Sequence, residues 1–342
     1  MAGPAARRGL SLSIGISPRE SLAKWRELVV ELERRDVDSL WLIDSQIAMK
    51  DVYVGLTVAA LATTRMRLAA GVTNCITRHP TVTASATAAL ADLAPGRVSL
   101  GLGAGDSALH SIGHPPSTVA EMAEALGYFR SVLSGREGTW QERSYPPAWS
   151  GEPIGVYLAV SQRRMCNLAG RLADGAIIMG PADPEFLETQ VGWIRAGLEE
   201  AGRDRGEIEL LYVATTSANS DQRKALDDVS SWASAQARLL ADFKYVPAGL
   251  QQYGDEFVAA KESYDYAHHL STHAEHRGAI SEELTRRLAV VGSAEDCSQR
   301  LEQLRACGID GFIFPLMGGG RLERVRVLQE EILASPIAGR DQ

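Results

Sequence analysis

The sequence predicts a (β/α)8 barrel, in which eight short strands alternate with helices and close into a ring. Short apolar or β-branched runs alternate with longer segments of helical periodicity through most of the 342 residues, a pattern typical of parallel strands with helical crossovers. Eight such runs fit a closed barrel better than a doubly wound sheet, and the length is ordinary for a barrel. We therefore expect one domain over residues 1–342.

The elements follow in order along the chain. The expected strands are LSLSIGI (10–16), SLWLI (39–43), MRLAAGV (66–72), RVSLGLG (97–103), IGVYLAV (154–160), GAIIM (175–179), IELLYVATT (208–216) and GFIFPL (311–316). Helices are expected directly after Ser17-Pro18, which supplies an N-cap and a first-turn proline, and over about 51–64, 79–93, 118–134, 161–173, 183–202 and 321–333. The mainly helical segment at about 215–310 is interpreted as an insertion over the active-site face.

Composition excludes several classes of protein. The chain carries 43 acidic and 35 basic residues, a net charge of −8, which argues against a nucleic-acid groove. It contains no signal-peptide core and no apolar run of about 18 residues that would span a membrane. Its four cysteines show neither CxxC pairing nor the density of a disulfide framework. We expect a reduced, cytoplasmic protein.

The active site of such a barrel lies where the strands end. The residues there are Asp44, Val72-Thr73-Asn74, Gly103-Ala104-Gly105-Asp106, Ser161-Gln162 and Gly180-Pro181. The glycines of GLGAGD (101–106) either admit a flat or anionic ligand or close a tight turn. Ser161-Gln162, at the start of a helix, is either an anion site beside two arginines or a simple cap. No nucleophile stands beside a base.

Histidines offer two candidate groups for proton handling. His79 precedes Pro80 at a helix start, where it either donates to a ligand or orients a turn. Asp265, His269, His273 and His276 have the spacing of one helical face, which serves either substrate or proton handling or a polar structural role. No second element supplies zinc ligands, and the HxH pair of metal-dependent barrel hydrolases is missing from the first strand. We therefore expect no metal.

Taken together, the segments resemble the bacterial luciferase-like superfamily, in particular its deazaflavin-dependent branch, typified by methylenetetrahydromethanopterin reductase. The best part is AAGVTNCITRHPTVTASATAALADLAPGRVSLGLGAGDSAL (69–109), with Thr-Asn, Arg-His-Pro and Gly-x-Gly-x-Gly-Asp in the order of that branch. VYLAVSQRRMCNLAGRLADGAII (156–178) and LAVVGSAEDCSQRLEQLRACGIDGFIF (288–314) are also similar. Two departures are Ser161-Gln162 in place of Ser/Ala-Gly-Pro, and Ser45 after Asp44, where the family often has histidine.

The resemblance implies a barrel that binds an isoalloxazine or deaza-isoalloxazine ring at the strand ends. Gly71-Val72 corresponds to a bulge, often with a cis non-proline peptide, that presses on the central ring. Further site residues implied in this way are Asp44, Thr73 and Asn74 at the ring or substrate, Ser161, Gln162, Met179 and Gly180 near the ribityl phosphate, and Gly103, Gly105 and Asp106 at the mouth.

The function that this resemblance implies is an F420-dependent oxidoreductase. Hydride would pass between C5 of the deazaflavin and a small organic substrate, with His79, His269 and Asp44 as the catalytic set. The alternative is an FMN-dependent monooxygenase that takes reduced flavin from a partner reductase and activates oxygen, and a third reading is a non-catalytic flavin-binding subunit. Relatives are usually dimers or tetramers, so a homodimer is expected.

Overall fold

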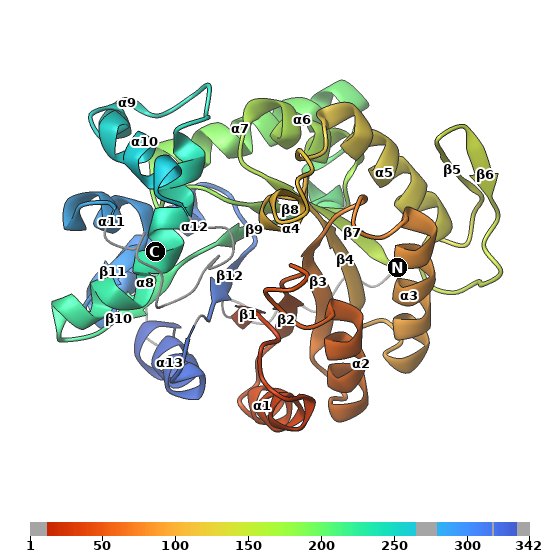
Figure 1. Cartoon of the computed structure of the whole chain (residues 1–342), viewed down its shortest axis with the longest axis horizontal. Helices are drawn as coiled ribbons and strands as arrows, with labels where there is room; N and C mark the ends of the chain where they lie inside the picture. Colours follow the sequence, from red (N-terminus) through yellow and green to blue (C-terminus); the bar gives the residue numbers. More distant parts are fainter. Residues whose placement is uncertain (1–11, 265–278, 317, 334–342) are drawn as a thin grey trace, which may run out of the picture.

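The protein folds around a closed barrel of eight parallel strands, in the order β1-β12-β9-β8-β7-β4-β3-β2 (Figure 1). The computed structural model describes residues 12–264, 279–316 and 318–333. The barrel confirms the predicted fold class. Its strands are β1 (Leu12–Ile16), β2 (Ser39–Leu42), β3 (Arg67–Thr73), β4 (Val98–Leu102), β7 (Gly155–Val160), β8 (Gly175–Ile178), β9 (Glu209–Val213) and β12 (Gly311–Pro315).

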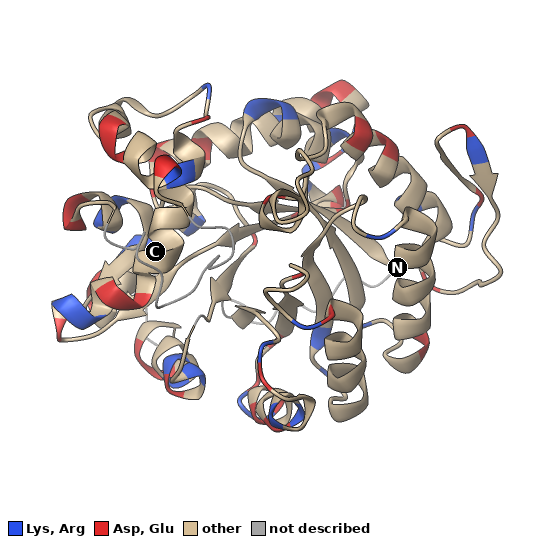
Figure 2. Ribbon diagram, in the orientation of Figure 1, with Lys and Arg blue, Asp and Glu red and all other residues tan. Residues whose placement is uncertain are grey.

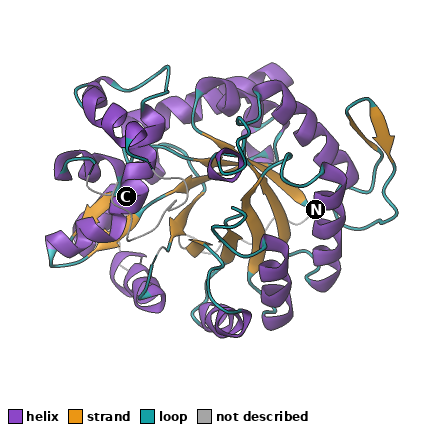
Figure 3. Ribbon diagram, viewed as in Figure 1, coloured by secondary structure: helices purple, strands orange, loops and turns teal. Residues whose placement is uncertain are grey.

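A ring of helices surrounds the strands (Figure 3). These are α1 (Leu22–Arg34), α2 (Val52–Ala62), α3 (Pro80–Leu93), α5 (Val119–Val132), α6 (Arg163–Leu172), α7 (Pro184–Ala201), α12 (Ala294–Ala306) and α13 (Arg321–Val327), after which a π-helix covers Leu328–Leu333. The expected start of the first helix after Ser17-Pro18 was wrong. Ser17 is buried, and it is the Ser21 hydroxyl that accepts a hydrogen bond from the Lys24 N–H and caps the helix.

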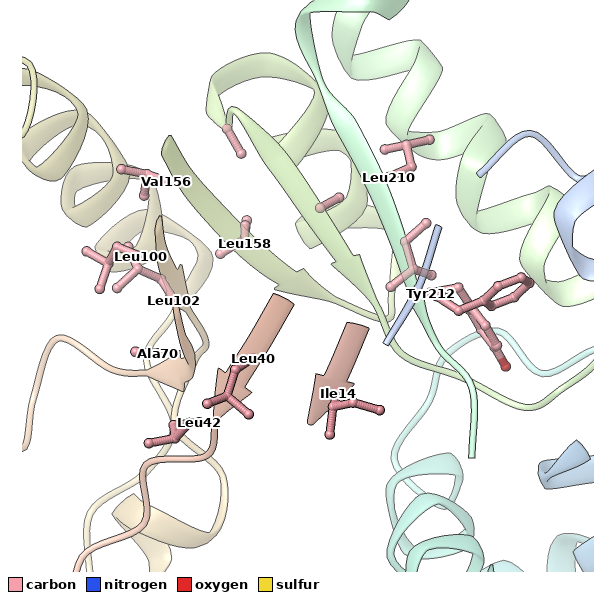
Figure 4. Close-up of a cluster of buried hydrophobic side chains, with 14 of the residues drawn as sticks. Ile14, Leu40, Leu42, Ala70, Leu100, Leu102, Val156, Leu158, Leu210 and Tyr212 are labelled. Carbon is pink, nitrogen blue, oxygen red and sulfur yellow. The ribbon is translucent and has the colours of Figure 1, made fainter. Parts of the chain in front are cut away.

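Successive side chains of each barrel strand point alternately outward and inward, which gives one apolar layer outside the strands and one inside the barrel. Ile14, Leu40 and Leu42 belong to the large cluster between the strands and the outer helices (Figure 4). Trp41 and Tyr157 belong to a second cluster inside the barrel, where their rings meet edge to face with centroids 5.2 Å apart. Because successive side chains of a strand point to opposite faces, one short strand serves both layers.

Charged residues lie mostly on the helices and loops outside the barrel, and the strands carry few of them (Figure 2). This distribution leaves both strand layers apolar and places the solvated groups at the surface. Within the described part of the chain, every helix is too short or too polar to cross a bilayer.

Between β9 and β12 the chain forms a small unit beside the barrel. It contains β10 (Thr216–Ala218), α8 (Gln222–Leu240), α9 (Ala248–Gln251), α10 (Gly254–Glu262), α11 (Glu282–Leu288) and β11 (Val290–Gly292). The two strands pair in parallel. We expected a mainly helical segment, and these three-residue strands are too short to show a period in the sequence.

A hairpin of β5 (Gly138–Trp140) and β6 (Arg143–Tyr145) projects beside α5, where no strand was expected from the sequence (Figure 1). Its two loop residues, Gln141 and Glu142, both have positive φ, 48° and 63°. Two-residue loops of this kind usually carry Asn-Gly or Asp-Gly. Because neither is present here, the hairpin has no turn signature in the sequence.

The third strand is bulged at the mouth of the barrel. The Gly71–Val72 peptide is cis, and the register of β3 against β4 shifts between Ala70 and Thr73, as the resemblance implied. The neighbouring strand makes room for this bulge. A Cβ added to Gly101 would lie 2.5 Å from the Ala70 carbonyl oxygen, and one added to Gly103 would lie 2.6 Å from the Val72 side chain.

We predict that Gly101→Ala destabilises the protein because its methyl group would meet backbone as well as the Val72 side chain. The free energy of unfolding should fall by about 1–3 kcal/mol, measured by chemical denaturation. Gly127→Ala is the matched control, since Gly127 is exposed in α5 with no atom within 4 Å of the added methyl. The control should stabilise the helix by about 0.5–1 kcal/mol. Equal effects of the two substitutions would contradict the steric argument.

Candidate active site

Two adjoining cavities open where the barrel strands end. The first, which we call the central cavity, covers about 1040 Å³ at the mouth of the barrel. The second, the side cavity, covers about 910 Å³ against the ends of β4, β7 and β8. They adjoin each other, because they share the lining residues Val72, Gly105, Asp106, Met179, Gln236 and Leu239. We refer to the two together as the cleft, and the strand ends that it occupies are where such barrels bind small molecules.

Most residues expected at the site lie along this cleft. Those in the central cavity are Asp44, Gly71, Val72, Thr73, Asn74, Gly105, Asp106 and Met179. Those in the side cavity are Val72, Gly103, Gly105, Asp106, Ser161, Met179 and Gly180. Two expected residues, His79 and Gln162, do not line either cavity. His269 and its neighbouring histidines lie outside the described residues.

Asp44 anchors the loop that follows β3. Its Oδ2 accepts hydrogen bonds from the Thr73 hydroxyl at 2.7 Å and from Arg78 Nη1 at 2.5 Å, and its side chain is only 4% exposed. Arg78 also reaches Asp51, with Nη2 2.7 Å from Oδ2. Burial alone would lower the pKa of Arg78, but its bonds to the two carboxylates outweigh burial and raise that pKa. Asp44 is therefore held in an ion pair, which favours positioning over proton exchange.

A second ion pair joins the loop after β4 to α8. Asp106 stands directly before α4 (Ser107–His110), and its Oδ2 lies 2.5 Å from Arg238 Nη2. The Arg238 side chain is 6% exposed, and its guanidinium lies 4.5 Å from the Tyr264 ring centroid. Asp106 itself is 38% exposed, with Oδ1 3.8 Å from His110 Nε2. This pair fixes α8 over the cleft.

The side cavity ends at the start of α6. Ser161 lines it, and Gln162 is the N-cap residue, although its side chain does not cap the helix. Instead, the Gln162 amide exchanges hydrogen bonds of 3.4 Å with the backbone of Tyr245. The first N–H groups of a helix have no intrahelical partner. The Ser161 hydroxyl and these N–H groups therefore form an arrangement suited to an anion.

Gln190, on α7, positions this end of the cleft, a role that no pattern in the sequence indicates. It is fully buried, and its Nε2 donates to the carbonyl oxygens of Ser161 and Met179, both at 2.9 Å. A Cβ at Gly180 would lie 2.8 Å from the Phe186 ring. The strand ends of β7 and β8 are thus held together by one buried amide.

His79 serves the helix that it begins. The exposed ring caps α3, with Nδ1 accepting from the Thr81 N–H at 3.3 Å, and it meets the Tyr145 ring at a centroid distance of 6.2 Å. Of the two roles weighed from the sequence, this position supports the orientation of a turn. It does not support the expected role as a proton donor.

The segment at about 215–310 was expected over the active-site face, but the sequence analysis named none of the α8 residues that line the cavity. Trp232, Ala235, Gln236 and Leu239 line the central cavity from this helix, and their spacing places them on one face. The available signal was weak: small residues and a tryptophan in VSSWASAQARLL indicate a closely packed helix but not what it packs against. Among the described residues, no group of three or more His, Cys, Asp or Glu side chains is arranged to hold a metal ion.

The chain belongs to the luciferase-like monooxygenase family, whose family model matches residues 6–311. It is an oxidoreductase of this class, as the motifs at the strand ends indicated. It is 25% identical over 340 residues, 95% of this chain and 100% of the relative, to a 5,10-methylenetetrahydromethanopterin reductase of Methanolobus tindarius. Over 174 residues, 47% of this chain and 51% of the relative, it is 30% identical to an F420-dependent glucose-6-phosphate dehydrogenase of Nakamurella multipartita.

A solved structure shares the fold. The coenzyme F420 dependent tetrahydromethanopterin reductase of Methanopyrus kandleri aligns with a TM-score of 0.77 at 21% identity, covering 95% of this chain and 98% of that chain. The likeness extends over the barrel and the segment that contains α8, so the fold as a whole is common to both proteins.

We predict that His79→Ala lowers the free energy of unfolding by about 0.5–2 kcal/mol, the usual cost of losing a helix cap. His79→Asn should keep most of the stability, because asparagine caps helices well. Thermal unfolding of the three proteins measures both effects. If the alanine variant is as stable as the parent, His79 does not stabilise the helix as a cap, and the proton-donor role becomes the better explanation of this residue.

Proposed function

We propose that the protein is an F420-dependent oxidoreductase that exchanges hydride with a small organic substrate. The observation that carries this proposal is the pair of adjoining cavities, one with an apolar floor at the β3 bulge and the other ending at the start of α6, where the free N–H groups are suited to an anion. The similarity to F420-dependent enzymes, among them the glucose-6-phosphate dehydrogenase of Nakamurella multipartita, supports the choice of cofactor.

The central cavity fits a flat ring. Val72 lines both cavities from the bulge, and it packs in a cluster with Trp41, Ile177 and Met179. Planar apolar ligands favour such lining, with a few polar groups at the edge. When bound, the deazaflavin supplies or accepts a hydride at C5. The apolar side chains orient the ring and exclude water.

The side cavity fits the tail of the cofactor. Gly103 and Ala104 line its course toward Ser161, where the hydroxyl and the first N–H groups of α6 are suited to a phosphate. Arg163 and Arg164 are exposed in the first turn. Their positive charge suits the acidic tail that distinguishes F420 from FMN.

We assign proton exchange with the substrate to Asp106. Both carboxylates are ion-paired, but Asp44 is 4% exposed and its Oδ2 accepts from both Arg78 and Thr73. Asp106 pairs with Arg238 through Oδ2, yet it is 38% exposed and lines both cavities. His110, 3.8 Å from it, connects Asp106 to solvent. His269, expected from the sequence to share this role, stays a prediction.

The experiment that tests the proposal is an anaerobic titration of the full chain with oxidised and reduced F420 and FMN, followed by absorbance and fluorescence. We expect F420 to bind much more tightly than FMN. A preference for reduced FMN, with oxygen consumed on mixing, would instead indicate the monooxygenase alternative. Binding of F420 without turnover on any alkene, imine or ketone would indicate a binding protein.

We predict that Ser161→Asp weakens F420 binding by more than about tenfold, or 1.4 kcal/mol, because a carboxylate would face the phosphate. Ser161→Ala should lose a single hydrogen bond, worth about 0.5–1.5 kcal/mol. Ser85→Asp is the matched control, since Ser85 is exposed on α3 and lines neither cavity. Equal affinities of the two aspartate variants would show that the tail lies elsewhere.

A further inference from the structure

The helix α8 forms a roof over the central cavity. Trp232, Ala235, Gln236 and Leu239 all line it, at spacings of three, four and seven residues that place them on one helical face. The ion pair of Arg238 with Asp106 holds this face against the barrel mouth. The floor of the cavity and its roof therefore come from segments far apart in the sequence.

Two polar side chains of this roof are buried without partners. The Trp232 indole Nε1 and both Nε2 and Oε1 of the Gln236 amide have no hydrogen-bond partner in the part of the chain that the structure describes. Gln236 is 5% exposed and Trp232 is 9% exposed. Native proteins satisfy nearly all buried polar groups, and both side chains line the central cavity, so a molecule bound there is the natural source of the missing partners.

The ionised side chains around the central cavity already form ion pairs within the protein. The ionised side chains that line it are Asp44, Asp106 and Arg238. Arg238 is paired with Asp106, and Asp44 is paired with Arg78. Among the described lining residues, no further cation stands ready to receive a phosphate or carboxylate of a substrate. An anionic substrate is therefore disfavoured in the central cavity.

Most of the remaining lining is apolar, with Thr73, Asn74 and Ser107 as the uncharged polar exceptions. Ile43, Val213, Leu239 and Ile313 line the same cavity as the two unpartnered side chains. An aliphatic or alicyclic body would bury surface against them. Two N–H donors, from Trp232 and Gln236, can serve one oxygen atom, which has two lone pairs, and a hydroxyl group can in addition donate to the Gln236 Oε1.

We propose that Trp232 and Gln236 form the substrate-recognition site of this enzyme, donating hydrogen bonds to the carbonyl or hydroxyl oxygen of an uncharged, largely apolar substrate. The inference rests on the proposed function only in that the substrate shares the central cavity with the cofactor ring. The expected substrate is a neutral ketone or alcohol, so this protein would differ in substrate from an enzyme that selects a phosphorylated sugar.

The first experiment measures binding without turnover. The full chain is saturated with oxidised F420, and the affinities of cyclohexanone, methylenecyclohexane and cyclohexyl phosphate are compared by ligand-observed NMR. We expect cyclohexanone to bind about tenfold or more tightly than either of the others, a difference of about 1.4 kcal/mol. Methylenecyclohexane has the same shape without the oxygen, and cyclohexyl phosphate tests for an anion. Equal binding of the first two, or tighter binding of the phosphate, overturns the inference.

The second experiment uses Gln236→Leu and Trp232→Phe. Each should weaken cyclohexanone binding at least fivefold and remove its advantage over methylenecyclohexane. Gln299→Leu, at an exposed position of α12, is the matched control and should keep that advantage. If Gln236→Leu weakens F420 as strongly as cyclohexanone, the amide serves the cofactor and the inference is wrong.

Stability of the ligand-free protein tests the premise directly. Replacing a buried amide that has no partner by leucine should leave the unfolding midpoint unchanged or raise it. A lower midpoint would show that Gln236 is satisfied within the protein, and it would overturn the inference. If F420 does not bind the parent protein, the proposed function is wrong. That result is distinct from the results above, which overturn only the substrate-recognition inference.

Discussion

The close approach of β3 and β4 at the barrel mouth is the constraint on which the site depends. Val72 turns toward the cleft only because β4 presents glycine at positions 101 and 103, where any Cβ would collide with β3. The same bulge gives both cavities a common lining residue. The apolar floor and the meeting of the two cavities at Val72 thus both depend on the room that Gly101 and Gly103 of β4 leave for β3.

Two ion pairs hold the loops around this floor. Arg78 binds Asp44 and Asp51, which fastens the loop after β3 to the second strand and to the start of α2. Arg238 binds Asp106 and fastens α8 to the loop after β4. Both arginine side chains are largely buried, where an unpaired charge would be costly. These two ion pairs therefore act chiefly to hold the loops and α8 in place. The chemistry is left to the cofactor and to few protein groups.

The sequence predicted the barrel strands because their signals are local: apolar runs of the right length, separated by helical periods. It also predicted the residues at the strand ends, since barrel topology alone places these at one face. It missed Arg238, Gln236 and Gln190, because their roles depend on contacts between segments distant in the chain. It predicted His79 as a proton donor, whereas the structure places the ring as the cap of α3, because the position in the sequence alone does not distinguish the two roles.

Floor and roof have separate origins, and this has an evolutionary consequence. The floor is formed by the ends of barrel strands spread through the chain, from Trp41 to Ile313, whereas the face of α8 that covers it comes from the segment between β9 and β12. Mutations in α8 can alter which molecules enter without disturbing the strands beneath. Proteins descended from such a barrel would acquire new substrate specificity by changes in α8, while the strand ends that bind the cofactor stay the same. Recombination within the segment between β9 and β12 would make such changes in one step.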